Sequence, residues 1–76
     1  MDTNKLTPNR IEQMRKTCKS IIGIHRTKPD NLTYAKIGNR FGVSPSTVKN
    51  SLHYRDTEKS LQLLVDIYEY LVGEYS

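Results

Sequence analysis

Cys18 and His25 are the two side chains whose types and spacing could support covalent or metal chemistry. They lie seven residues apart, so a helix would place a thiol and an imidazole on one face. The chain has one cysteine, and His53 is the second of its two histidines. A closed zinc site typically takes four protein ligands at short spacings, and this sequence does not supply them. We therefore expect Cys18 to be a small core residue, and we expect neither an enzyme nor a bound metal or other cofactor.

The single cysteine also excludes an internal disulfide, which favours a reducing, cytoplasmic location. No apolar run approaches the roughly 20 residues of a membrane span. The opening residues lack the apolar core of a secretion signal, and residues 1–6 are expected to be a flexible tail. At 76 residues the chain predicts one domain, residues 1–76, with a modest core and no evident small-molecule ligand.

Positive charge is concentrated in the first part of the chain. Residues 1–55 contain eleven Lys or Arg and three acids, whereas residues 56–76 contain one Lys and five acids. A basic body is typical of a protein that binds a polyanion. The acidic segment would be repelled by phosphate, so we expect it to face away from such a partner or to pair with another chain. The alternative is a basic protein with an incidental charge gradient.

Two short capped helices are predicted in the middle of the chain, over residues 34–41 and 45–54. Thr33 and Ser44 are suitable N-caps, and Pro45 suits the first position of the second helix. Gly42 can end the first helix because glycine adopts the left-handed conformation at little cost. Each cap follows an apolar residue that can pack on the fourth helical position as a hydrophobic staple.

Residues 33–54 resemble the helix-turn-helix of bacterial and phage DNA-binding proteins, and the lac-repressor-type and resolvase-type versions most of all. The residues that carry the resemblance are Ile37, Gly38, Phe41, Gly42, Val43, Ser44, Thr47, Val48 and Leu52. In that family a small residue, often alanine, sits where Gly38 is, so that the two helices approach closely. The match covers about 22 of the 76 residues, and a helical hairpin that uses the same caps for packing alone is the alternative.

The resemblance implies that residues 45–54 form a recognition helix in the major groove of double-stranded DNA. Asn50 can pair bidentately with adenine, and Lys49 can donate to guanine or to phosphate. Lys36 and Arg40 are expected to contact the DNA backbone. The predicted DNA-binding residues are Thr33, Tyr34, Lys36, Arg40, Ser44, Pro45, Ser46, Thr47, Lys49, Asn50, His53, Tyr54 and Arg55.

A domain of this kind most often serves transcriptional control, which predicts a small bacterial or phage regulator, by default a repressor. One alternative is the DNA-recognition subunit of a larger machine, such as a small terminase subunit, a transposase or a recombination accessory protein. Another is a protein-interaction module that does not bind DNA.

Apolar residues at three- and four-residue steps predict a first helix from Pro8 to about Ile24, capped by Thr7. Four of its basic residues lie largely outside the apolar stripe, where they form a solvated face or reach phosphates: Arg10, Arg15, Lys16 and Lys19. A basic loop, residues 25–31, follows. No alternating strand pattern occurs, which argues against a β-wing. The predicted fold is an all-α bundle of about four helices with a long C-terminal helix.

That C-terminal helix is expected at residues 57–75, with Asp56 and Thr57 as equal candidates for its cap. Its first apolar stripe suffices to cover a small core. A second stripe beside it consists of Leu63, Ile67 and Tyr70. Together the two stripes span roughly 220° of the helix, against about 100° for a helix buried on one side. The second stripe therefore predicts a homodimer interface, unless the fold wraps this helix on both sides.

Overall fold

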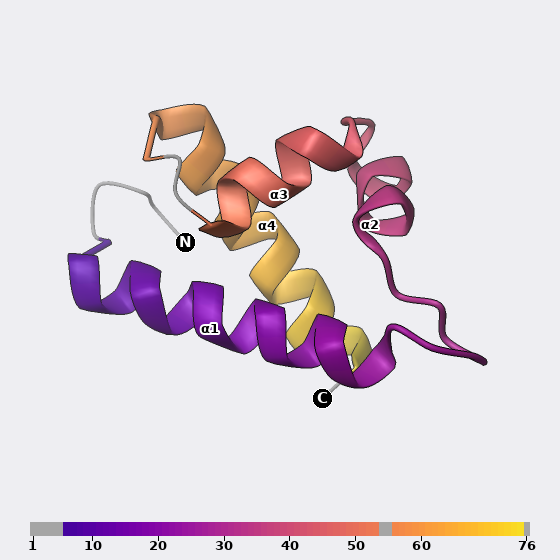
Figure 1. The fold of residues 1–76 in the computed structure, drawn as a ribbon. Coiled ribbons are helices and arrows are strands. Elements are labelled where there is room, and N and C mark those ends of the chain that lie inside the picture. The colour runs from indigo at the N-terminus through magenta and orange to yellow at the C-terminus, as the bar shows by residue number, and fades with distance from the viewer. Residues whose placement is uncertain (1–5, 54–55, 76) are drawn as a thin grey trace.

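A computed structural model describes residues 6–53 and 56–75, which fold into four α-helices (Figure 1). The helices are α1, Pro8–His25; α2, Tyr34–Phe41; α3, Pro45–His53; and α4, Glu58–Tyr75. Within these residues there is no strand, and the predicted all-α class with a long last helix is confirmed. Tyr54 and Arg55, both predicted to bind DNA, lie outside the described residues.

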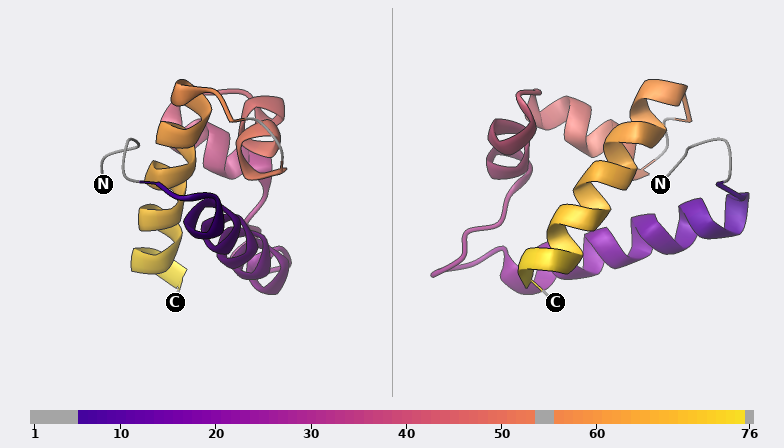
Figure 2. Two further views of the ribbon diagram at one scale, coloured as in Figure 1. Left: turned by 90° about the vertical axis from the view of Figure 1, so that its left-hand side faces the viewer. Right: turned by 180° about the vertical axis from the view of Figure 1, so that it is seen from behind.

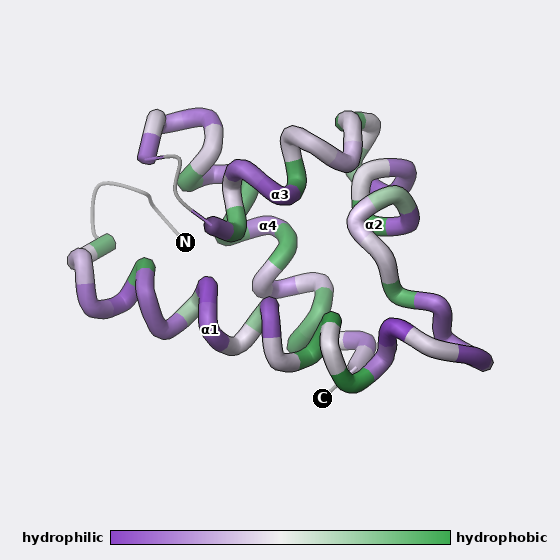
Figure 3. Tube along the Cα trace, in the orientation of Figure 1, coloured by the Kyte–Doolittle hydropathy of each residue, from purple (hydrophilic) through white to green (hydrophobic). Residues whose placement is uncertain are grey.

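Helix α4 is the centre of the packing. It contacts both α1 and α3, while α2 packs mainly against α3 (Figure 2). In Figure 1 α4 passes behind α3 and runs down to the C-terminal end of α1, where the His25 and Tyr75 rings lie 5.1 Å apart. The hydrophobic positions of α4 run through the middle of the molecule (Figure 3). The short helix α3 is therefore held in place by the two long helices α1 and α4, and α2 is held by α3.

The core takes apolar side chains from all four helices and from the loop before α2. Its buried members are Met14, Cys18, Ile21, Ile22, Leu32, Ile37, Val48, Leu52, Leu64, Val65, Ile67 and Leu71. Leu32 is fully buried, and its amide donates to the His25 carbonyl oxygen at 2.8 Å. The loop between α1 and α2 is thereby tied to the end of α1.

The prediction of an exposed second stripe on α4 is wrong for Ile67, which is fully buried within the single chain. Leu63 and Tyr70 are half-buried and pack against the same core. The physical reason is that α4 packs against both α1 and α3 within the single chain, so residues of both stripes contact the core.

Little of the apolar surface is left for self-association. The large apolar side chains exposed among the described residues are Ile24, at 71%, and Val72, at 36%. They do not form the stripe on which the expected dimer interface rested. The homodimer therefore stays a prediction without its original physical basis.

The predicted caps form as expected. The Thr7 and Thr33 hydroxyls accept the Arg10 and Lys36 amides at 3.1 and 3.2 Å. Thr57, and not Asp56, caps α4, because the Thr57 hydroxyl accepts the Ser60 amide at 3.3 Å. These bonds satisfy amide groups that have no partner within their own helices.

Leu6 belongs to the segment predicted as a flexible tail, yet it is half-buried and packs against the core. Residues 1–5 lie outside the described part of the chain. At the other end of α1 the helix continues one residue further than predicted, to His25.

Ser51 contributes an unsatisfied polar atom to the core. It is fully buried on the inner side of α3, and its hydroxyl has no hydrogen-bond partner among the described residues. A buried hydroxyl without a partner costs about 1–3 kcal/mol. The small alanine side chain fits in the same space and carries no polar atom.

We therefore expect Ser51→Ala to raise the free energy of unfolding by about 1 kcal/mol. Chemical denaturation followed by circular dichroism measures the change. Ser20→Ala, at an exposed position of α1, is the matched control and should leave stability within about 0.5 kcal/mol of the wild type. A loss of stability in Ser51→Ala would mean that the hydroxyl does have a partner.

Candidate nucleic-acid interface

The turn between α2 and α3 is built on Gly42, which has φ +70° and ψ 32°. The Gly42 and Val43 amides both donate to the Gly38 carbonyl oxygen, the latter at 2.9 Å. This pattern is a Schellman-type end, in which a left-handed residue lets the chain turn back on the helix. The structure thus confirms the predicted turn and sets the direction in which α3 leaves α2.

Gly38 lies where α2 meets the turn. A Cβ atom at this position would overlap the Val43 carbonyl oxygen, well inside van der Waals contact. Gly38 itself is buried. The close approach expected from the resemblance is therefore present, but it is tighter than the alanine common in the family would permit.

Ser44 and Thr47 hold the start of α3. The Ser44 hydroxyl accepts the Thr47 amide at 3.2 Å, and the two hydroxyls are hydrogen-bonded at 2.9 Å. Pro45 and Ser46 follow the cap and are exposed. The structure therefore gives Ser44 a capping role and leaves both hydroxyls at the surface, where they can also reach a ligand.

The outer face of α3 is polar over its whole length. Ser46, Lys49, Asn50 and His53 recur at three- and four-residue steps, so they lie on one side of the helix. Ser46, Lys49 and His53 are exposed, and Asn50 is half-buried. The opposite side is buried through Val48, Ser51 and Leu52. The structure thus brings four of the predicted DNA-binding residues together on one surface of a helix that the core holds in place.

Tyr34 joins this surface from α2. Its hydroxyl lies 2.9 Å from Nε2 of His53, and the two rings meet edge to face with centroids 6.2 Å apart. The first turn of α2 and the last turn of α3 are therefore linked by a hydrogen bond between two predicted site residues. Thr33 is exposed beside them as the cap of α2.

Lys36 and Arg40 are not brought to the same face. The Lys36 ammonium donates to the Asp30 carbonyl oxygen at 2.6 Å and so closes the preceding loop. The Arg40 guanidinium lies over the Tyr70 ring of α4, 5.3 Å from its centroid. Arg40 lines a groove together with three acidic residues of α4, Asp66, Glu69 and Glu74. Both cations thus serve contacts within the fold, and neither adjoins the four α3 side chains.

Arg15 does not lie on the solvated face predicted for it from the sequence but bridges α1 and the end of α3. Its Nε donates to the Ser51 carbonyl oxygen at 3.2 Å, and its Nη2 lies 3.0 Å from Asp56 Oδ1. Ser51 is in the last turn of α3, where carbonyl groups lack helical partners and a cation is favoured. Arg15 therefore positions the end of α3 against α1. The sequence does carry a signal, since Arg15 lies four residues after Ile11 and three before Cys18, on the apolar side of α1.

Cys18 and His25 do not form a reactive pair. Cys18 is fully buried, and burial raises the pKa of its thiol to about 12. The Nδ1 atom of His25 instead lies 2.7 Å from an Asp30 carboxylate oxygen. The described residues contain no cluster of His, Cys, Asp or Glu that could hold a metal ion. The prediction of Cys18 as a core residue is confirmed.

Negative charge lies on α4. Glu58, Asp66, Glu69 and Glu74 are all exposed on this helix, which lies behind α3 in Figure 1. None of the described helices is long and apolar enough to cross a membrane.

Comparison of the chain with models of protein families, with curated proteins and with solved structures finds no match.

Proposed function

We propose that this chain is a sequence-specific protein that binds double-stranded DNA, a small transcriptional regulator that acts as a repressor. The observation that carries the proposal is the polar face of α3, formed by Ser46, Lys49, Asn50 and His53 on a helix whose other side is buried. A helix of this kind fits the major groove, where the base edges present a distinct pattern for each base pair.

The side chains of that face suit base and phosphate recognition. Asn50 has the amide that pairs bidentately with adenine, and Lys49 can donate to guanine or to a phosphate. Thr33 places the start of α2 near the same surface, and helix N-termini bind phosphate. Tyr34 is held beside His53, and its phenol can donate a hydrogen bond to a phosphate of the DNA backbone. Arg40 is left out of the proposed interface because it lies against Tyr70.

The charge distribution supports the same orientation. The exposed acids lie on α4, which passes behind α3 in Figure 1, and the described residues of α3 itself include no acid. The basic residues of α1 and α3 provide the electrostatic attraction that DNA binding requires.

The test begins with selection of a preferred duplex from a random-sequence library, followed by affinity measurement by fluorescence anisotropy. Asn50→Ala should weaken binding to the selected site by about 1–3 kcal/mol and barely change binding to random DNA, because a lost base contact removes specificity. The matched control is Asn9→Ala, at an exposed position in the first turn of α1. Equal losses on both duplexes would assign Asn50 to the DNA backbone instead.

The wild-type protein should also bind more weakly as salt rises, because neutralised phosphates release counterions. Failure to bind any duplex at low salt would overturn the proposal and favour the protein-interaction module. Repression of a reporter whose promoter carries the selected site would separate a regulator from the recognition subunit of a larger machine. An inverted repeat in the selected site would be the mark of a homodimer.

A further inference from the structure

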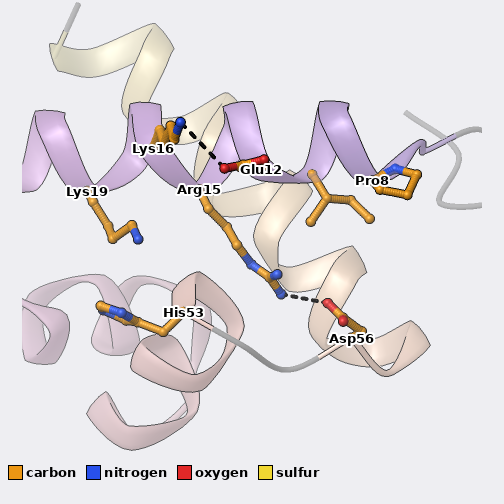
Figure 4. Close-up of a pocket in the computed structure, with 8 residues that line it drawn as sticks. Pro8, Glu12, Arg15, Lys16, Lys19, His53 and Asp56 are labelled. Carbon is orange, nitrogen blue, oxygen red and sulfur yellow. Dashed lines mark hydrogen bonds and ion pairs between the residues drawn. The ribbon is translucent and has the colours of Figure 1, made fainter.

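A basic groove lies between α1 and the end of α3 (Figure 4). Its volume is about 550 Å³. The residues that line it are Pro8, Ile11, Glu12, Arg15, Lys16, Lys19, His53 and Asp56. The groove joins the polar face of α3 at His53, which belongs to both. In the proposed function the basic residues of α1 contribute general attraction to DNA, and in this groove they lie beside the polar face of α3.

Both acids of the groove are already paired. Glu12 Oε1 lies 3.4 Å from the Lys16 ammonium, one turn away on α1. Asp56 Oδ1 lies 3.0 Å from Arg15, which also donates to the α3 backbone. The acids therefore offset Lys16 and Arg15, and the charge of Lys19 is not offset by an ion pair within the described residues.

Lys19 is exposed and points from α1 toward His53 (Figure 4). Lys49 lies one turn before His53 on α3 and is also exposed. Partial burial, and then the positive charges of Lys19, Lys49 and Arg15, lower the pKa of His53 below its usual value of 6.5. Among the described residues, Tyr34 is bonded to Nε2 of His53, and Lys16 and the paired acids Glu12 and Asp56 line the same groove. The site thus holds unneutralised positive charge from two helices.

We propose that this groove binds a backbone phosphate of the DNA, held between Lys19 of α1 and the protonated ring of His53. This inference rests on the proposed function, and it makes α1 the third helix of the interface. A phosphate there would neutralise the cations that crowd His53 and would accept a charge-assisted hydrogen bond from the ring. The contact carries no base information, so it adds equally to the affinity for every sequence.

The contact couples DNA binding to proton uptake. In the free protein the pKa of His53 is lowered, so the ring is mostly neutral near pH 7. A bound phosphate favours the imidazolium and raises that pKa, so binding takes up a proton between the two values. Affinity should therefore rise as pH falls through the window between the higher pKa of His53 in the complex and its lowered pKa in the free protein, by at most about tenfold per pH unit for one proton.

The experiment measures anisotropy of the selected duplex against the full chain at pH 8 and pH 5.5, over a salt series. Lys19→Ala should reduce the slope of log affinity against log salt by about 0.9, the value for one phosphate contact. His53→Gln should remove most of the gain in affinity at low pH. Lys59→Ala, an exposed lysine of α4 outside the groove, is the matched control and should change neither quantity.

Proton NMR of the His53 ring provides the direct reading. Its pKa should rise when the duplex is added, and Lys19→Ala should reduce that rise. Inorganic phosphate is the second probe, and a rise with phosphate but none with duplex would show a site for small anions and overturn the inference. Unchanged salt slope in Lys19→Ala together with intact binding by the wild type would overturn the inference and leave the proposed function standing. A wild-type protein that binds no duplex would contradict both this inference and the proposed function.

Discussion

Ile67→Asp is expected to unfold the protein. Ile67 is fully buried at the centre of α4, so the change removes about 1.5–3 kcal/mol of apolar burial. It also places a carboxylate among apolar side chains, which costs several kcal/mol more even after the group takes up a proton. Native domains are stable by about 0.05–0.15 kcal/mol per residue, or roughly 4–11 kcal/mol for this length. The loss therefore approaches the whole free energy of folding.

Circular dichroism and urea denaturation test this expectation. The control is Val72→Asp on the same helix, where the side chain is 36% exposed, and it should cost about 1 kcal/mol or less. Ile67→Val should remain folded and lose about 0.5–1.5 kcal/mol, which measures the same site without the charge.

The Ile67→Asp variant also distinguishes a core role for this face of α4 from a role in a dimer interface. If Ile67 were a dimer-interface residue, Ile67→Asp would be a folded monomer whose α-helical content is unchanged. Light scattering combined with circular dichroism would show this outcome, which would contradict the burial of Ile67 in a single chain.

Gly38→Ala is expected to destabilise the protein, although alanine is the better helix former by about 0.5–1 kcal/mol. The added Cβ would overlap the Val43 carbonyl oxygen, which belongs to the backbone of the turn and cannot swing aside as a side chain can. Overpacking costs about 1–3 kcal/mol, and the upper end applies where backbone must move. We expect a net loss of about 2 kcal/mol after the gain in helix propensity.

Two other glycines give a sharp control for this effect. Gly23 in α1 and Gly73 in α4 have open space where a Cβ would lie. Gly23→Ala and Gly73→Ala should therefore raise the free energy of unfolding by up to about 1 kcal/mol each. Thermal and urea denaturation of the three variants compares them directly. A gain of stability in Gly38→Ala would show that the turn opens without cost.

The sequence alone predicts the four helices and most of their ends. Thr7, Thr33 and Ser44 were predicted as caps and are caps, and Gly42 takes the left-handed conformation expected of it. The polar face of α3 also follows from spacing along the chain. These features depend on interactions over three to five residues, which the order of residue types largely determines.

The sequence does not predict residue roles that depend on how the helices pack against one another. Arg40 lies in α2 as predicted but faces Tyr70 of α4, and a phosphate role for it followed only from the resemblance. The choice between Asp56 and Thr57 as a cap was open because both types are suitable. In the structure the Asp56 carboxylate pairs with Arg15 of α1, and the Thr57 hydroxyl caps α4.

Local interactions along the chain therefore specify the four helices, three of the four caps and the turn before α3. The tertiary structure decided which surfaces of those helices remain exposed. It buries Ile67 because α4 packs against both α1 and α3, and it brings Lys19 of α1 toward His53 at the end of α3, where Arg15 links the two helices. Periodicity shows which residues share a face, whereas only the crossing of the helices shows what that face meets.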